Sequence, residues 1–222
     1  MRISFCLKLI LPFCLLLILN IACSSKKTFE SSVANSQLHN LSADENKKIY
    51  SSSCESGNPK DCGILGFLEN EDRNIPGARK AYLQACASNY IDACSLLGFL
   101  EERNGNLVEA KTLHEKACSS GNILSCNNLA LIVSKQGDEI EAKRLFEKTC
   151  KGRVLGGCVQ LGLMGLKDNV DEAKIFFKKA CDGGEGLGCI QLGNHERGNG
   201  KSNEASRWFK KACEAGESVA CQ

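Results

Sequence analysis

The sequence predicts an all-α protein, an α/α solenoid of short two-helix repeats that C-x7-C disulfides cross-link. Twelve of the fifteen cysteines form six pairs with the same spacing, and successive pairs start 31 or 32 residues apart. A fixed period in this range is typical of a repeat array and not of a single globular core. The scarcity of proline, three residues in 222, favours helices. The pairs are Cys54–Cys62, Cys86–Cys94, Cys118–Cys126, Cys150–Cys158, Cys181–Cys189 and Cys213–Cys221.

Two helices are expected in each repeat, because residues between the cysteine pairs recur at helical intervals. Ala142, Leu145, Phe146 and Thr149 stand at i, i+3, i+4 and i+7, the spacing of one buried helix face. We name the helix with the second cysteine of a pair helix A, and the helix with the first cysteine of the next pair helix B. Four residues after the second cysteine, a small residue lets the two helices approach closely: Gly66, Gly98, Ala130, Gly162 and Gly193.

Turn-forming residues separate the helices. Polar triplets at 104–106, 136–138, 167–169 and 198–200 predict the turns from helix A to helix B. Between the two cysteines of a pair, the turn from helix B to helix A is predicted at Gly121-Asn122, Gly156-Gly157 and Gly183-Gly184. We therefore expect about five and a half repeats over residues 44–222, arranged in one right-handed superhelix.

The N-terminus is typical of an exported protein. Arg2 and Lys8 flank an apolar run, residues 9–22, that is too short for a membrane span and fits a signal peptide. The end of the run, Leu19-Asn20-Ile21-Ala22-Cys23, resembles a bacterial lipobox, in which the cysteine is acylated and becomes the mature N-terminus. Asn20 stands where a branched apolar residue is usual, and an uncleaved anchor or an ordinary cleavage site are the alternatives.

These features predict a lipoprotein signal peptide over residues 1–22 and a flexible, polar tether over residues 23–43. The repeat array follows over residues 44–222. The expected location is the bacterial cell envelope, with the chain lipid-anchored at Cys23, in the outer membrane on its periplasmic or surface face.

The cysteine count is consistent with this organisation. Cys6 and Cys14 would leave with the signal peptide and Cys23 would be acylated, so an even number remains. The paired cysteines bracket the turn from helix B to helix A, where antiparallel helix ends bring them together. Zinc binding is the alternative, but C-x7-C is not the usual zinc spacing and the only histidines are His39, His114 and His195. We expect six local disulfides, no metal site and no cofactor.

The repeats resemble Sel-one-like repeats, which are tetratricopeptide-related, and are most similar to the bacterial cysteine-rich Sel-one-like proteins. The likeness is carried by the Lys-Ala-Cys…Cys…Leu-Gly cores, such as Lys179-Ala180-Cys181…Cys189…Leu192-Gly193. It extends from about Asp44 to Cys221. The turn from helix A to helix B is shorter than in that family and has tetratricopeptide length.

The resemblance implies a protein- or peptide-binding surface on helix A, at positions 1, 2, 5 and 8 after the second cysteine of each pair. In tetratricopeptide-like arrays these positions line the concave side. Asn128, Gln160 and Gln191 share position 2, and we expect them to hydrogen-bond the backbone of an extended peptide, because an amide both donates and accepts. The alternative is that they join neighbouring helices. The candidate binding residues are Asn127, Asn128, Gln160, Gln191, Asn194 and Arg197.

No catalytic residue is predicted. Some relatives are classed as penicillin-binding or β-lactamase proteins, so the alternative function is binding or hydrolysis of β-lactams or peptidoglycan fragments. The one S-x-x-K sequence, Ser24 to Lys27, falls in the tether and not on a helix. His114 is expected to be a helix-face residue and not a catalyst, and charged pairs such as Glu101-Glu102 are expected on solvated helix faces. A net charge of +2 gives no indication of nucleic-acid binding.

The C-terminal edge is a further candidate surface. No helix A follows the helix B around Trp208 and Phe209. An uncovered apolar face can receive a partner or a second copy of the chain. The alternative is that Trp208 packs inward against the helix A of its own repeat.

Overall fold

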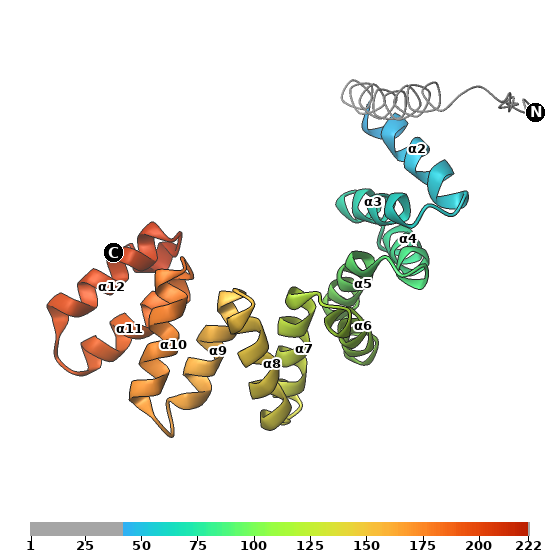
Figure 1. The fold of residues 1–222 in the computed structure, drawn as a ribbon. Helices are drawn as coiled ribbons and strands as arrows, with labels where there is room; N and C mark the ends of the chain where they lie inside the picture. The colour runs from blue at the N-terminus through green and yellow to red at the C-terminus, as the bar shows by residue number, and fades with distance from the viewer. Residues whose placement is uncertain (1–41, 222) are drawn as a thin grey trace, which may run out of the picture. The chain divides into compact units, whose positions relative to one another are not determined.

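The computed structural model describes residues 42–221, and every element in that range is a helix. The chain divides into two compact units, residues 1–52 and residues 53–222. Helix α2 (Ala43–Glu55) lies across this division (Figure 1). The second unit continues with α3 (Pro59–Glu71), α4 (Ile75–Ala87), α5 (Ile91–Arg103), α6 (Leu107–Ser119), α7 (Ile123–Lys135), α8 (Glu139–Lys151), α9 (Leu155–Gly165), α10 (Val170–Asp182), α11 (Gly186–Gly198), α12 (Ser202–Glu214) and the 3₁₀ turn η1 (Ser218–Ala220).

The helices pack in chain order. From α3 to α12, each helix packs against the helix before it and the helix after it within the second unit. Helices α3, α5, α7, α9 and α11 are A helices, and α4, α6, α8, α10 and α12 are B helices. Helix α2 is a B helix that precedes the first A helix, so the described residues form five and a half repeats. This confirms the predicted solenoid of short helical pairs.

Most linkers between helices have three residues, and the middle residue of each adopts a left-handed φ. Glycine provides this conformation in seven linkers, whereas Arg73, Asn89 and Arg153 provide it in three. Asparagine or aspartate commonly closes the linker as an N-cap, as where Asn122 Oδ1 accepts a hydrogen bond of 2.9 Å from the Ser125 amide. The linker over residues 166–169 is longer by one residue and has no left-handed residue.

The predicted turn at Gly156-Gly157 was wrong. Both glycines lie in the first turn of α9, and the linker comprises residues 152–154 with Arg153 as its left-handed residue. The cysteine register explains this, because Cys150 and Cys158 place the linker at the same offset as in every other repeat. Gly157 serves close packing instead, since an added Cβ would overlap Thr149 of α8. The predicted turn at 198–200 is also displaced by one residue, to 199–201.

A pair of glycine substitutions tests this assignment. Gly121→Ala should lower the free energy of unfolding by about 1–2 kcal/mol, because Gly121 has a φ of +95° that disfavours an L side chain. Gly156→Ala should raise it by about 0.5–1 kcal/mol, because Gly156 is helical and an added Cβ would meet nothing within 4 Å. Urea unfolding of the oxidised protein measures both. Equal signs for the two variants would contradict the placement of Gly156 in the helix.

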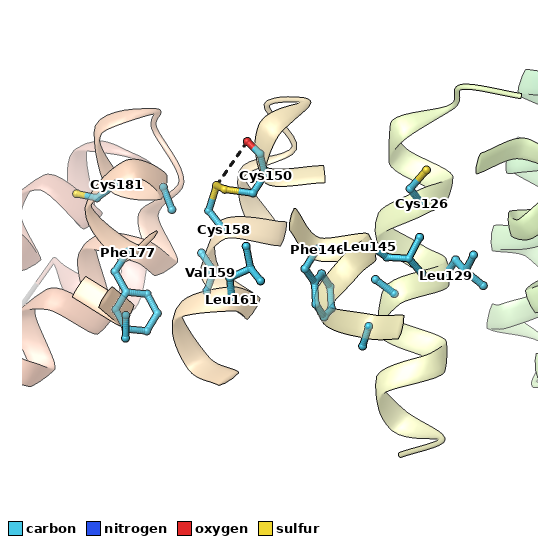
Figure 2. Close-up of a cluster of buried hydrophobic side chains, with 14 of the residues drawn as sticks. Cys126, Leu129, Leu145, Phe146, Cys150, Cys158, Val159, Leu161, Phe177 and Cys181 are labelled. Atoms are coloured by element: carbon cyan, nitrogen blue, oxygen red, sulfur yellow. Dashed lines mark hydrogen bonds between the residues drawn. A yellow bond between two sulfur atoms is a disulfide. The ribbon is translucent and has the colours of Figure 1, made fainter. Parts of the chain in front are cut away.

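In the core of each repeat, an aromatic side chain of helix B packs against a small residue of helix A. Twenty residues after the second cysteine, or nineteen in the repeat of α9, stand Tyr82, His114, Phe146, Phe177 and Phe209. Opposite them are the predicted small residues. An added Cβ at Gly162 would lie 2.5 Å from the Phe177 ring, and one at Gly98 would lie 2.7 Å from the His114 ring. Figure 2 shows Phe146 and Phe177 among the buried side chains. His114 is therefore a core residue of its repeat, on the face of helix B that packs against helix A.

Disulfides join all six predicted pairs. Each joins the last turn of a B helix to the first turn of the following A helix, or to the residue after η1 in the last pair, with Cα–Cα separations of 4.6–4.9 Å. The ten cysteines of the first five pairs are buried, whereas Cys213 is half-buried and Cys221 is exposed. Figure 2 also marks a contact of 3.7 Å between Cys158 Sγ and Cys150 O. An oxidised sulfur has no hydrogen to donate, so this is a polar contact and not a hydrogen bond.

The lysine of the Lys-Ala-Cys core connects successive repeats. Lys116 Nζ donates a hydrogen bond of 2.9 Å to the Cys86 carbonyl, and Lys148 Nζ donates one of 3.3 Å to the Cys118 carbonyl. Gln84 takes the same position and donates to the Cys54 carbonyl at 2.9 Å. These carbonyls belong to the last turn of the preceding B helix, where no intrahelical donor remains. A cation there also interacts favourably with the helix dipole.

Candidate binding surface

The side of each A helix turned away from its B helix is partly open to solvent. Position 5 after the second cysteine follows the small residue that contacts helix B. Phe67 and Phe99 at this position are 50% and 51% exposed, Leu163 is exposed and Leu131 is half-buried. Large apolar side chains therefore recur on an accessible face of the A helices, at the position where the sequence predicted a binding surface.

The three amides predicted at position 2 lie on the same side. Asn128, Gln160 and Gln191 are each half-buried, and no hydrogen bond of the described residues involves any of their side chains. The alternative role as a link between neighbouring helices requires such bonds. Gln84 shows what a linking amide looks like here, since it donates across repeats to the Cys54 carbonyl. The amides at position 2 retain their capacity to donate and accept.

The other three candidate residues have different environments. The Asn127 side chain is half-buried, and its Oδ1 atom is enclosed without a hydrogen-bond partner. Asn194 and Arg197 lie together, because Arg197 Nη2 donates a hydrogen bond of 3.0 Å to Asn194 Oδ1. The Arg197 guanidinium also stands 5.3 Å from the centre of the Phe209 ring. Arg197 is thus held in place by its own repeat, with both side chains exposed.

A charged network between repeats was not predicted. Glu101, expected on a solvated face, is completely buried. Arg79 Nε of α4 donates to Glu101 Oε1 at 2.6 Å, and Asn106 Nδ2 donates to Glu101 Oε2 at 2.6 Å. The Arg79 guanidinium also reaches Glu109 of α6 at 2.8 Å. A buried carboxylate is tolerated when it is paired and hydrogen-bonded in this way.

The same arrangement recurs later in the array. Lys174 of α10 approaches Glu196 of α11 at 3.8 Å, and Lys201 approaches the same carboxylate at 3.6 Å. Arg79 and Glu101 are 22 residues apart, as are Lys174 and Glu196. This shared separation is the sequence signal that could have identified the network.

A cavity of about 570 Å³ lies among α8, α9 and α10. Leu161, Leu163 and Met164 of α9 and Phe176 of α10 provide its apolar lining. Lys143 of α8 reaches it from the preceding repeat. Helix α9 has eleven residues where the other helices from α2 to α12 have thirteen, so the cavity coincides with the irregular repeat.

The C-terminal edge holds Trp208 in contact with its own array. The ring is half-buried and packs against the core cluster that includes Leu192 of α11. Lys211 Nζ lies 5.0 Å from the centre of the ring. Trp208 therefore packs inward against its own repeat, as in the alternative to self-association given above.

Two further findings concern residues 42–221. No helix there is long and apolar enough to cross a membrane. No three His, Cys, Asp or Glu side chains there come together as a metal site would require. The predicted signal peptide, tether and acylation site at Cys23 lie outside the described residues, apart from the last two residues of the tether.

Comparison with known proteins agrees with the repeat architecture. The tetratricopeptide repeat family model matches residues 123–156, which cover α7 and α8. A Sel1 repeat protein from Oxalobacter formigenes has a TM-score of 0.64 at 16% identity, over 79% of this chain and 84% of its own. The fold is that of a Sel1-like helical repeat protein. No curated protein sequence matches the chain.

Other Sel1-like structures extend the comparison. A protective antigen of uropathogenic Escherichia coli with an SLR fold has a TM-score of 0.69 at 22% identity over 78% of this chain. This chain spans 42% of that antigen, less than half its length. A sel1 repeat protein from Klebsiella pneumoniae has a TM-score of 0.52 at 21% identity, over 79% of this chain and 95% of its own. At these identities the likeness concerns the fold alone.

Proposed function

We propose that the protein is an interaction scaffold of the bacterial cell envelope, lipid-anchored at Cys23, whose A helices bind an extended peptide segment of a partner protein. The observation that carries the proposal is the unused hydrogen-bonding capacity of Asn128, Gln160 and Gln191. Three amides at the same repeat position, each half-buried and without a hydrogen-bond partner among the described residues, suit the regularly spaced groups of a peptide backbone.

The apolar residues of the same face supply the second part of the surface. Leu131 and Leu163 stand three residues after Asn128 and Gln160, so amide and apolar side chain share one helix face. An extended peptide can donate and accept along its backbone while its side chains contact these leucines. Phe67 and Phe99 continue the apolar series toward the N-terminus of the array.

The proposal is tested by replacing Asn128, Gln160 and Gln191 with alanine in one variant. A partner is first recovered by crosslinking from envelope extracts, and its affinity for the purified proteins is then measured by isothermal titration calorimetry. We expect the triple variant to bind that partner at least tenfold more weakly, because the peptide backbone loses its amide partners. Its thermal midpoint should match that of the wild type, since these side chains make no hydrogen bond within residues 42–221.

Gln84→Ala is the matched control. It also removes one amide, but this amide donates to the Cys54 carbonyl and so stabilises the contact between repeats. It should lower the thermal midpoint and leave the partner's affinity unchanged. A triple variant that loses stability and retains the partner would show that the amides at position 2 join helices instead.

A further inference from the structure

The cavity at the irregular repeat lies where a regular pairing of charges is interrupted. Each of four successive B helices has a cation at one repeat position: Arg79, Lys111, Lys143 and Lys174. The residue 22 positions later, on the A helix of the next repeat, faces that cation in two of the four cases. There it is a buried carboxylate, Glu101 opposite Arg79 and Glu196 opposite Lys174.

The two middle repeats lack this carboxylate. The residue 22 positions after Lys111 is Val133. Lys111 Nζ instead donates a hydrogen bond of 3.1 Å to Gln136 Oε1. Gly165 stands opposite Lys143, at the end of the shortened helix α9. Lys143 makes no hydrogen bond or ion pair in the described part of the chain, whereas the other three cations each have a partner.

The missing side chain leaves space. A Cβ added at Gly165 would meet only the Ala173 methyl group, at 3.8 Å. The cavity of about 570 Å³ opens at this point and is lined by Lys143 and Gly165 together with Leu161, Met164 and Phe176. It therefore combines an unpaired cation with an apolar wall, at a place where two other repeats bury the chain's own carboxylate.

We propose that this cavity binds a peptide segment that presents one carboxylate to Lys143 and an adjacent apolar side chain to the leucine, methionine and phenylalanine wall. The ligand's carboxylate replaces the glutamate that Gly165 lacks. Three exposed carboxylates, Glu139, Asp168 and Glu172, and a second exposed cation, Lys167, also line the cavity. The carboxylates outnumber the two lysines, so they disfavour a second negative charge on the ligand. The site thus selects a single carboxylate beside an apolar group and not an acidic run.

The test uses short blocked peptides and the oxidised full-length protein. Acetyl-Ala-Leu-Glu-Ala-amide, its Gln counterpart and acetyl-Ala-Ala-Leu with a free carboxylate are titrated and followed by ¹H–¹⁵N NMR. We expect the Glu peptide to bind at least fivefold more tightly than the Gln peptide, with shifts centred on the amides of Leu161 to Phe176. Binding of the third peptide would show that a chain-end carboxylate serves as well as a glutamate.

Two variants and one control assign the site. Gly165→Glu supplies an internal carboxylate and should abolish binding of the Glu peptide while the thermal midpoint stays the same or rises. Lys143→Gln should reduce the preference for Glu over Gln to less than twofold. Lys111→Gln removes the equivalent cation one repeat earlier and should change neither result.

Equal binding of the Glu and Gln peptides, no binding of either, or undiminished binding by the Gly165→Glu variant would overturn the proposal. The cavity shares Leu163 with the proposed peptide surface but none of the three amides. The substitutions that test the two sites are at different residues, so the two tests can fail independently.

Discussion

Replacing Cys118 and Cys126 together by alanine is expected to lower the free energy of unfolding by about 2–3 kcal/mol. The bridge closes a short loop, so its removal increases the conformational freedom of the unfolded chain by the amount that the loop-entropy model gives for this length. Both cysteines are buried in the cluster shared by α6 to α12, and alanine leaves part of their volume empty. Urea unfolding of the variant against the fully oxidised wild type gives the difference.

The bridge between Cys213 and Cys221 is the control for position in the array. It closes a loop of the same length, but it connects α12 only to η1, and Cys221 is exposed. In a linear array each unit is stabilised by its neighbours, so breaking an internal unit affects both sides and breaking a terminal unit affects one. Hydrogen exchange in the terminal double variant should therefore accelerate mainly after residue 202. Global loss of protection in both variants would contradict this picture.

The disulfides stabilise contacts that are small individually. Many contact positions of helices A and B are glycine and alanine, such as Gly98, Ala110, Gly162 and Ala173, which bury little apolar area per residue. The lysine-to-carbonyl bonds and the Arg79–Glu101 pair add polar contacts between repeats. A short local cross-link in every repeat offsets the limited core of each unit.

The repeats could be predicted from the sequence because the cysteine spacing and the small residues recur at the same positions in every repeat. The cysteine spacing places the linkers, and the small residues opposite the rings place the helix contacts. The error at Gly156-Gly157 arose where composition was given more weight than this register. Glycine is common in turns, but here Gly157 is required by the close approach of Thr149, which only the packed helices reveal.

Residues that depart from the repeat were harder to interpret. Glu101 is charged and was expected in solvent, yet its partners are Arg79 of α4 and Asn106 of the linker before α6. Lys143 is informative only because the residue 22 positions later, Gly165, has no carboxylate to pair with it. The likeness to tetratricopeptide-like arrays indicated which side of helix A to consider, but the hydrogen bonds of its amides depend on their neighbours and could not be predicted.

Because of His114, the free energy of unfolding is expected to fall by about 3 kcal/mol as the pH is lowered from 6.5 to 4. It occupies the ring position of its repeat, is completely buried, and neither ring nitrogen has a hydrogen-bond partner. Burial lowers the pKa of His114 to about 4. The Glu102 carboxylate stands 3.9 Å from Nε2, but it is partly exposed, so solvent weakens its attraction for a protonated ring.

The direction follows from proton binding in the two states. Between pH 6.5 and pH 4 the unfolded chain protonates this histidine and the folded protein does not, so the unfolded state gains stability as the pH falls. The contribution of neutral His114 to the free energy of unfolding is fully present above pH 6.5. Its loss is nearly complete below pH 4. Arg144 lowers the pKa of Glu141, and Lys178 lowers the pKa of Asp182. Protonation of these two carboxylates therefore lowers the free energy of unfolding at the acid end of this range and below it.

His114→Phe should remove most of the pH dependence between 6.5 and 4, because phenylalanine fills this position in the repeats of Phe146, Phe177 and Phe209. Urea unfolding at several pH values compares this variant with the wild type. The reverse exchange, Phe146→His, is the matched control, and it should introduce the same dependence one repeat later, where Phe146 is equally buried. A slope unchanged by His114→Phe would mean that the folded protein takes up this proton as readily as the unfolded chain, and therefore that the imidazole is not excluded from water in solution.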